Sequence, residues 1–263
     1  MTKIVTHPGA RTDRNPTPEA IGAIKLHSIL QGVGGWGVSE DFLSSATKDA
    51  AENGITSSGT WTRKEVGAGV AGAAFTQVVG EAGGAFLLDP GTTVPENQGI
   101  QVQLLGDSFK PAAGANIYFG TLLKTELLAS DVFAGLSLTT TDSDRVLASG
   151  DTASSDFVGF FWDQTDLHFR GKKSGVTAES NDTGLALVAN TYTKLEFVIT
   201  DTNSVIPFVN GIRYSEAKLS SPPVVAVTPS LAVTGQGGTD HSAVTIDWVK
   251  CYQQQDLVRV GSA

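Results

Sequence analysis

Hydrophobic and polar residues alternate in many short stretches of this chain. In the stretch TKLEFVI, Leu195, Phe197 and Ile199 occupy one set of alternate positions, and Lys194 and Glu196 occupy the other. A β-strand points successive side chains to opposite faces, so a period of two indicates a strand with one face on a core and one face in solvent. The dominant pattern of the chain therefore predicts β-structure.

Eleven stretches carry such strand signals, and polar or glycine-containing turns separate several of them. The stretches are residues 58–66, 72–91, 99–105, 115–127, 131–142, 156–163, 166–173, 193–200, 205–211, 229–235 and 243–253. Turn residues at 163–166, 201–204 and 210–211 favour short connections between neighbouring strands. About a dozen short strands at this spacing predict an all-β chain that folds as an antiparallel β-sandwich.

Two local features modify this picture. Pro207 lies inside an otherwise good strand, and because proline cannot donate a ladder hydrogen bond, we expect that strand to be an edge or to carry a bulge. Residues 44–54 (SSATKDAAENG) begin with serine and end with glycine, which predicts a short helix or helical turn.

Residues 1–38 differ from the rest of the chain in charge. They contain Lys3, Arg11, Arg14 and Lys25 against Asp13 and Glu19, a net charge of +2, which leaves 14 basic and 25 acidic residues, or −11, in the remainder. Residues 17–31 carry a weak helical pattern, and GVGGWG at 32–37 is typical of a hinge. We interpret 1–38 as an extended N-terminal arm, 39–255 as the sandwich and 256–263 as a C-terminal tail. The arm either lies along a neighbouring subunit or is a frayed terminus.

The overall composition argues against several classes of protein. A net charge of −9 disfavours a general nucleic-acid binder, because phosphate contacts need a basic surface. No run of 18 or more apolar residues occurs, so no transmembrane helix is expected, and the start of the chain has no apolar signal core, which favours synthesis in a cytoplasm. The single cysteine, Cys251, cannot form a disulfide within the chain and is interpreted as a buried thiol on a strand.

The second half of the chain resembles a known superfamily. Residues 192–211 (YTKLEFVITDTNSVIPFVNG), followed by residues 228–253 (TPSLAVTGQGGTDHSAVTIDWVKCYQ), resemble the final strands of concanavalin A-like jelly rolls. That superfamily includes legume lectins, laminin-G-type modules and jelly-roll β-glucanases. The resemblance covers about residues 155–255 and implies a jelly-roll antiparallel β-sandwich, but a fold that hosts many functions does not fix the activity.

The layout of the whole chain is also similar to that of structural proteins of tailed bacteriophages. The similar features are Glu40-Asp41-Phe42-Leu43, Gly59-Thr60-Trp61-Thr62, the GGAFLL stretch and Val158-Gly159-Phe160. This resemblance implies a virion protein that decorates or cements a phage head, with the major capsid protein and copies of itself as partners. We expect a homo-oligomer on the capsid surface, such as a trimer at three-fold positions of the shell, made in the host cytoplasm.

Within that interpretation, the body and the N-terminal arm both contact capsid subunits. The predicted contact residues of the arm are the four basic residues Lys3, Arg11, Arg14 and Lys25. No nucleic acid and no membrane is expected as a partner.

Catalytic patterns are not found in the sequence. The glucanase branch of the superfamily carries E-x-D-x-E on one strand, where alternation puts three carboxylates on one face, and no such strand occurs here. The acids Asp142, Asp144, Asp163 and Asp166 fall in expected turns, and residues 179–182 have the wrong spacing in a loop-like stretch. The four histidines show no metal-binding spacing, and no nucleophile or phosphate-loop motif is present. We therefore predict no catalytic residue, no metal, no cofactor and a protein that is not an enzyme.

A carbohydrate-binding, lectin-like module for adhesion to host glycans is the alternative function. Such a module needs an exposed aromatic platform and polar groups that hydrogen-bond to sugar hydroxyls. Trp162 is the leading platform residue, because it begins the WDQTD turn, whereas Trp248 alternates with apolar neighbours and is expected in the core. Residues 142–144 (DSD) and 201–203 (DTN) look like calcium-binding turns, but ordinary turn chemistry explains both.

Overall fold

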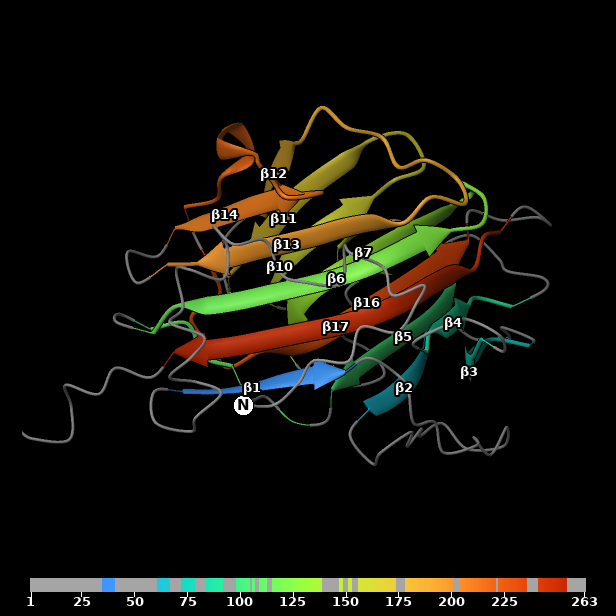
Figure 1. Cartoon of the computed structure of the whole chain (residues 1–263), viewed down its shortest axis with the longest axis horizontal. Coiled ribbons are helices and arrows are strands. Elements are labelled where there is room, and N and C mark those ends of the chain that lie inside the picture. Colours follow the sequence, from blue (N-terminus) through green and yellow to red (C-terminus); the bar gives the residue numbers. More distant parts are fainter. Residues whose placement is uncertain are drawn as a thin grey trace, which may run out of the picture.

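Two antiparallel β-sheets lie face to face in the computed structural model of the chain (Figure 1). The structure describes residues 35–40, 61–66, 72–78, 84–91, 98–104, 106, 109–112, 115–138, 147–148, 151–152, 156–173, 178–200, 204–220, 222–235 and 241–254. These residues contain one 3-10 helix, Ser215–Ala217, and no α-helix. The predicted all-β fold is confirmed.

The first sheet is built around two long central strands. Its order is β15 (Ile212–Arg213), β14 (Val205–Val209), β13 (Thr193–Ile199), β6 (Ile117–Thr125), β17 (Val244–Gln254), β4 (Phe86–Asp89) and β3 (Ala74–Gln77). An additional strand, β1 (Gly35–Glu40), pairs with the C-terminal part of β17, so that β1 and β4 share one edge of that strand. The register of every pair is antiparallel, as the sequence predicted.

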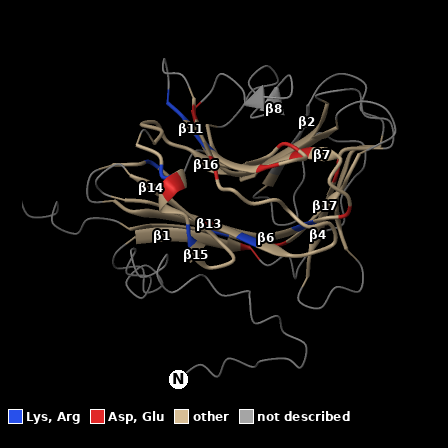
Figure 2. Ribbon diagram, turned by 90° about the horizontal axis from the view of Figure 1, so that it is seen from above, with Lys and Arg blue, Asp and Glu red and all other residues tan. Residues whose placement is uncertain are grey.

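The second sheet has seven strands and forms the other layer of the sandwich (Figure 2). Its order is β12 (Glu179–Asp182), β11 (Leu167–Lys172), β10 (Phe157–Trp162), β7 (Ser130–Ser137), β16 (Thr228–Gly235), β5 (Gly99–Leu104) and β2 (Trp61–Val66). A small hairpin, β8 (Leu147–Ala148) with β9 (Asp151–Thr152), follows β7 in the chain, and β8 contacts β16.

Aromatic rings from both sheets meet in the core between the layers. Phe119 and Phe197 of the first sheet stack with ring centroids 5.1 Å apart, and Phe169 of the second sheet lies 5.5 Å from Phe197. Phe160 completes the group 4.8 Å from Phe169. All four side chains are buried, and burying such rings supplies a large share of the favourable free energy of folding.

A β-bulge in β17 changes which face its tryptophan occupies. The register of β17 against β6 shifts between Ile246 and Trp248, so the two residues point to opposite faces. Trp248 lies outside the core between the sheets, beside Gly120, where an added Cβ would be 3.2 Å from Trp248 Cζ3. The predicted burial of Trp248 is confirmed, but the side chain lies on the outer side of its sheet, because simple alternation does not allow for the extra residue.

The bulge leaves Cys251 on the core side of β17. The thiol is buried, and burial raises its pKa well above the ordinary value. The prediction of a buried thiol on a strand is confirmed.

Other local predictions can be compared with the structure. The nitrogen of Pro207 points away from β13 toward the outer side of β14, where Pro207 O accepts a hydrogen bond from Tyr214 N (3.0 Å) beyond the end of β15. The prediction of an edge strand or a bulge is wrong for β14 as a whole, because β15 and Leu219 pair along its outer side and its register with β13 is unbroken. Residues 179–182, interpreted as loop-like, form β12 instead, because they pair with β11 at the edge of the second sheet.

The division between arm and sandwich is affected by β1. Residues 35–38, placed in the arm and partly in a hinge, belong to a strand that pairs with β17, so the hinge interpretation is wrong for residues 35–37. The helical predictions at 17–31 and 44–54 lie outside the described residues, as do the DSD and DTN turns. Among the residues that the structure describes, no helix has the length and apolar character needed to cross a membrane.

Two neighbouring glycines let an aromatic ring lie flat on the second sheet. Gly135 of β7 and Gly159 of β10 are register partners. A Cβ at either position would be 3.0 Å from the ring of Phe133 and would also clash with backbone of the neighbouring strand. These positions therefore require the smallest residue for steric reasons.

Gly135→Ala is expected to lower the free energy of unfolding by about 1–3 kcal/mol, the usual cost of overpacking. The added methyl group would meet the carbonyl oxygen of Val158, which the sheet holds in place. Urea unfolding followed by circular dichroism measures the change. Gly171→Ala is the matched control, because its methyl group would first meet the flexible end of Leu219, at 2.7 Å. Equal losses in the two variants would contradict the close packing described for Gly135.

Candidate functional site

The outer face of the second sheet carries aromatic residues at its centre. Phe133 of β7, together with Phe157 and Phe161 of β10, forms a cluster separate from the core between the sheets. Phe133 and Phe157 meet edge to face, with ring centroids 6.0 Å apart. All three are at most 1% exposed. This aromatic centre is therefore not an open platform in the structure.

Buried polar side chains lie beside the aromatic centre. Gln103 Nε2 donates to Ser137 Oγ at 2.8 Å and to Ser230 Oγ at 2.9 Å, so three strands are joined by side-chain hydrogen bonds. Ser137 and Ser230 are themselves 2.7 Å apart. Buried polar groups of this kind are stable only when they are hydrogen-bonded to one another, which these are.

The same face becomes accessible toward its β11–β12 edge. There, six outward-facing polar residues form what we call the polar strip: Asp163, Asp166, His168, Arg170, Ser180 and Asp182. His168 pairs with Asp182 across β11 and β12, and Arg170 pairs with Ser180. The strip therefore brings together residues from one turn and two strands.

Arg170 is held in place by two contacts. Its Nε donates to Ser180 Oγ at 2.9 Å, and its guanidinium carbon lies 4.1 Å from the centre of the Phe161 ring. A guanidinium stacked on a ring is attracted to the electron-rich face. Arg170 thus covers the edge of the aromatic centre beside the strip.

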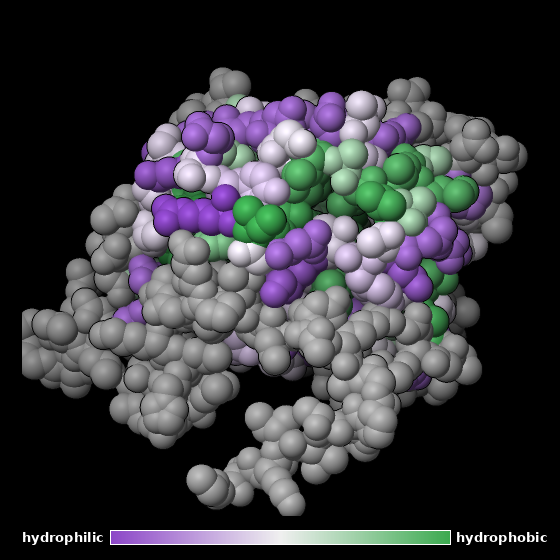
Figure 3. Space-filling view, turned by 45° about the horizontal axis from the view of Figure 1, so that its top comes forward, coloured by the Kyte–Doolittle hydropathy of each residue, from purple (hydrophilic) through white to green (hydrophobic). Residues whose placement is uncertain are grey.

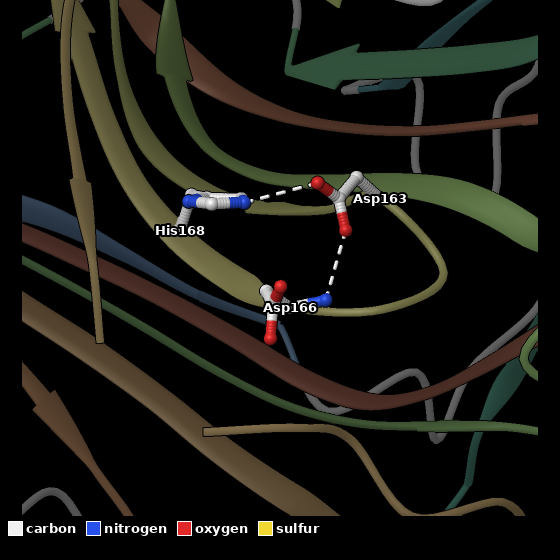
Figure 4. Close-up of side chains that lie close together, drawn as sticks. All are labelled: Asp163, Asp166 and His168. Atoms are coloured by element: carbon white, nitrogen blue, oxygen red, sulfur yellow. Dashed lines mark hydrogen bonds and ion pairs between the residues drawn. The ribbon is translucent and has the colours of Figure 1, made fainter. Parts of the chain in front are cut away.

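The β10–β11 turn fixes Asp163 (Figure 4). Asp163 Oδ1 accepts hydrogen bonds from the backbone N–H of Asp166 (2.8 Å) and Thr165 (3.1 Å), and Oδ2 lies 3.0 Å from His168 Nε2. Gln164 has a φ of 75°, a left-handed conformation suited to a tight turn. The prediction that Asp163 and Asp166 lie in a hairpin turn is confirmed.

The electrostatic state of Asp163 follows from these bonds. Burial raises the pKa of its carboxyl, but the hydrogen bonds from the backbone of Asp166 and Thr165 and the contact with His168 lower it by more. The net pKa lies below the ordinary value of 3.8. Asp163 is therefore ionised at neutral pH and acts as a fixed acceptor.

A third aspartate approaches the turn from another strand. Gln164 Nε2 donates to Asp131 Oδ1 at 3.1 Å, and Asp131 of β7 is 1% exposed. Because Val132 pairs with Trp162, the next positions along the two strands are Asp131 and Asp163. Acids far apart in the sequence are thereby placed at one end of the outer face.

The turn contains the donor set for a metal ion. One ligand atom each from Asp163, Asp166 and His168 lies within 4.8 Å of the others. Two ligands of one tetrahedral ion, each about 2.1 Å from it, are about 3.4 Å apart, whereas His168 Nε2 and Asp163 Oδ2 are 3.0 Å apart, the distance of their hydrogen bond. Two carboxylates and an imidazole suit zinc or another first-row divalent ion better than calcium, which prefers oxygen ligands.

The residues that the sequence singled out lie elsewhere. Trp162 is 1% exposed and belongs to the core between the sheets, so its expected exposure as a glycan platform is wrong. Its neighbours Val158 and Phe160 share its face, and a period of two puts all three inward. The arm residues Lys3, Arg11, Arg14 and Lys25 lie outside the described residues.

Comparison with known proteins identifies a fold. No protein-family model and no curated protein sequence matches the chain. An endo-1,3-beta-glucanase from Streptomyces sioyaensis has a TM-score of 0.54 and 12% identity, over 83% of this chain and 96% of that one. A protein of unknown function from Shewanella oneidensis gives 0.57 and 13%, over 87% and 90%. A glycoside hydrolase family protein from Mycobacterium thermorestibile gives 0.50 and 10%, over 81% and 99%.

These matches correct one prediction made from the sequence. The statement that the chain is not an enzyme is contradicted, because glycan-cleaving enzymes share its fold over most of their length. The search for acids was limited to single strands. Asp131 of β7 lies near the β10–β11 turn of Asp163 through its hydrogen bond from Gln164, which a search along a single strand does not detect.

The polar strip was missed as a unit for the same reason. The alternation of His168, Arg170 and Lys172 was a signal that one face of the strand is polar, and these three side chains are half-buried in the structure. The pairing of β11 with β12 was not visible, because residues 179–182 have little strand character.

The turn predicts a pH dependence of stability. The pKa of Asp163 is lower in the folded protein than in the unfolded chain. The ionised carboxylate therefore stabilises the fold at pH values above its ordinary pKa, and this stabilisation is lost as the pH falls through the folded pKa. Asp163→Asn is therefore expected to reduce the loss of thermal stability between about pH 5 and pH 2. Thermal unfolding across this range measures the effect. Asp166→Asn is the control, since it keeps the backbone donor; an unchanged pH profile in Asp163→Asn would contradict the assignment.

The comparisons and the geometry agree at the level of architecture: the chain folds as a concanavalin A-like jelly roll, the fold it shares with the endo-1,3-beta-glucanase from Streptomyces sioyaensis.

Proposed function

We propose that the chain binds glycans through the polar strip at the β11–β12 edge of the second sheet. The observation that carries the proposal is the fixed, partly exposed set of acceptors and donors. The side chains of Asp163 and His168 are 34% and 19% exposed, and Arg170 is held over Phe161. Sugar hydroxyls need both donors and acceptors in defined places, and preorganised side chains lower the cost of ordering on binding.

The fold supports this choice of ligand class. The Streptomyces sioyaensis protein with the same architecture is an endo-1,3-beta-glucanase. Oligosaccharides of β-1,3-linked glucose are therefore a reasonable first probe for the strip, with a glycan array to survey other linkages.

His168→Ala and Arg170→Ala are each expected to weaken glycan binding roughly tenfold, about 1.4 kcal/mol, through loss of a hydrogen bond to the sugar. Isothermal titration calorimetry with the best oligosaccharide from the array measures the affinity. Arg213→Ala is the matched control, because Arg213 lies on β15 of the first sheet. Glycan binding that is equal in all four proteins would place the site elsewhere, and an array without any bound glycan would refute the proposal.

Cleavage of the bound glycan is the second candidate function. The carboxylates of Asp163 and Asp166 each have an oxygen within 4.8 Å of the other, near the about 5 Å separation of the carboxyl pair in retaining glycosidases. Release of reducing sugar from the bound oligosaccharide is the readout. If the pair is catalytic, Asp166→Asn should abolish release and leave binding in place.

Decoration of a phage head is a separate proposal, supported by the resemblance of the sequence to phage structural proteins. It assigns the capsid contacts to the basic side chains of the arm. Changing Lys3, Arg11, Arg14 and Lys25 to Glu is expected to release the protein from phage heads in a co-sedimentation assay, because charge reversal turns attraction into repulsion. Changing Lys172, Lys173, Arg213 and Lys218 to Glu is the control. Equal retention of both variants would remove the arm from this role.

A further inference from the structure

Two neighbouring loops at one end of the sandwich expose apolar side chains. One is the β6–β7 turn, residues 126–129, and the other joins β12 to β13, residues 183–192. Leu127 and Val188 are 57% and 60% exposed. We use the name apolar patch for five residues of these loops that are exposed or half-buried: Leu127, Leu128, Leu185, Ala186 and Val188. Figure 3 shows hydrophobic residues gathered in one area of the surface, with hydrophilic residues around it.

Hydrogen bonds to the backbone hold both loops in place. Leu127 N donates to Ser242 Oγ at 2.7 Å, and Ser242 Oγ donates to Leu127 O at 2.6 Å. The second loop is tied to the first, because Asn190 N donates to Thr125 O at 2.7 Å and Asn190 Nδ2 donates to Glu126 O at 3.1 Å. The exposed apolar side chains therefore stand on a fixed backbone, which lowers the cost of ordering them when a ligand binds.

The second loop also adjoins the polar strip. Leu167 N donates to Leu185 O at 2.8 Å, and Leu167 lies between Asp166 and His168 of the strip. Val188 comes three residues after Leu185, so the two residues are at most about 11 Å apart. One ligand can therefore contact the polar strip and the apolar patch together.

The size of the apolar patch limits what it can bind. Leu127 and Val188 are its two large exposed side chains, and two such side chains offer less than the few hundred Å² of the largest patch on a typical monomer. A specific interface between proteins needs about 1,000 Å² or more. The apolar patch therefore fits a small group on a ligand better than a second copy of the chain.

The side chains around the apolar patch favour a neutral, aliphatic group. Glu126 begins the first loop, and Asp166 and Asp182 belong to the adjoining strip, so these acids would repel an anionic ligand such as a fatty acid. Tyr192 ends the second loop, but Lys124 Nζ lies over its ring, 5.0 Å from the ring centre. This face of the ring is therefore occupied, and the contacts that the patch itself offers are aliphatic.

We propose that the polar strip binds acetylated glycans and that the methyl groups of their acetyl substituents pack on Leu127 and Val188. This inference rests on the glycan binding proposed above, and it adds the class of sugar. An acetyl group is neutral and joins a methyl group to a carbonyl oxygen that accepts hydrogen bonds, so it suits a border between apolar and polar side chains. An O-acetyl ester and an N-acetyl amide both supply this group.

Two pairs of oligosaccharides test the proposal on the full-length protein. Tetra-N-acetylchitotetraose and cellotetraose share β-1,4-linked rings but differ in their acetamido groups. O-acetylated laminari-oligosaccharides are compared with the same material after saponification. By calorimetry, we expect the acetylated member of at least one pair to bind about fourfold more tightly or better, the factor for burying one methyl group. Equal affinities within both pairs, or no binding to any of these sugars, would overturn the proposal.

Variants of the apolar patch connect this preference to its residues. Leu127→Ser and Val188→Ser are each expected to bring the affinity ratio of the pair toward one and to leave the affinity for the unacetylated sugar unchanged. Val224→Ser is the matched control, because Val224 is 54% exposed and precedes β16 at the Ser137 end of the second sheet, opposite to the patch. A ratio that stays unchanged in both patch variants, or falls equally in the control, would contradict the assignment.

Two further measurements separate this inference from glycan binding at the strip. Arg170→Ala is expected to weaken binding of both members of a pair equally and so to keep their ratio. If unacetylated sugars bind and acetylated ones bind no better, the strip keeps its proposed function and the apolar patch has no part in it. Sedimentation of the native protein tests for a second copy: a dimer that Val188→Ser separates would overturn the proposal.

Discussion

The first sheet depends on β17, a strand of eleven residues with neighbours along both of its edges. On one edge it pairs with β6, and on the other it pairs first with β4 and then with β1. The loss of this strand would separate β6, β4 and β1 from one another; β6 would keep β13 and β4 would keep β3, and β1 would lose its partner strand. The bulge between Ile246 and Trp248 lies within it and determines which side chains of the strand face the second sheet. One strand therefore organises both the core and the outer face of its sheet.

The outer faces of the two sheets carry different kinds of side chains. The second sheet carries a buried centre of phenylalanines and hydrogen-bonded polar groups, which opens into charged residues near β12. The first carries aromatic and aliphatic residues around the hydrogen bond between Tyr118 and Glu196. The two layers therefore share one core but differ in the side chains of their outer faces.

The sequence was sufficient for the fold and insufficient for the site, for physical reasons. Alternation is a property of one strand, so residues such as Leu195 and Phe197 reveal their strand without any knowledge of its neighbours. The face of Trp162 could also have been found from Val158 and Phe160, had the period been given more weight than the turn that follows. The position of Trp248 could not, because a bulge has no clear local signal. The hydrogen bond between Gln164 and Asp131 joins residues 33 positions apart in the sequence. It depends on how β7 and β10 pair, and no local pattern contains that information.

The buried thiol of Cys251 can report the opening of the sandwich. A thiol that is fully enclosed and protonated does not react with alkylating reagents, because the reactive species is the exposed thiolate. Since the chain has no second cysteine, modification at this position would report only those molecules in which β17 has opened. The rate at which Cys251 is alkylated in the native protein therefore measures the rate at which the sandwich opens around β17.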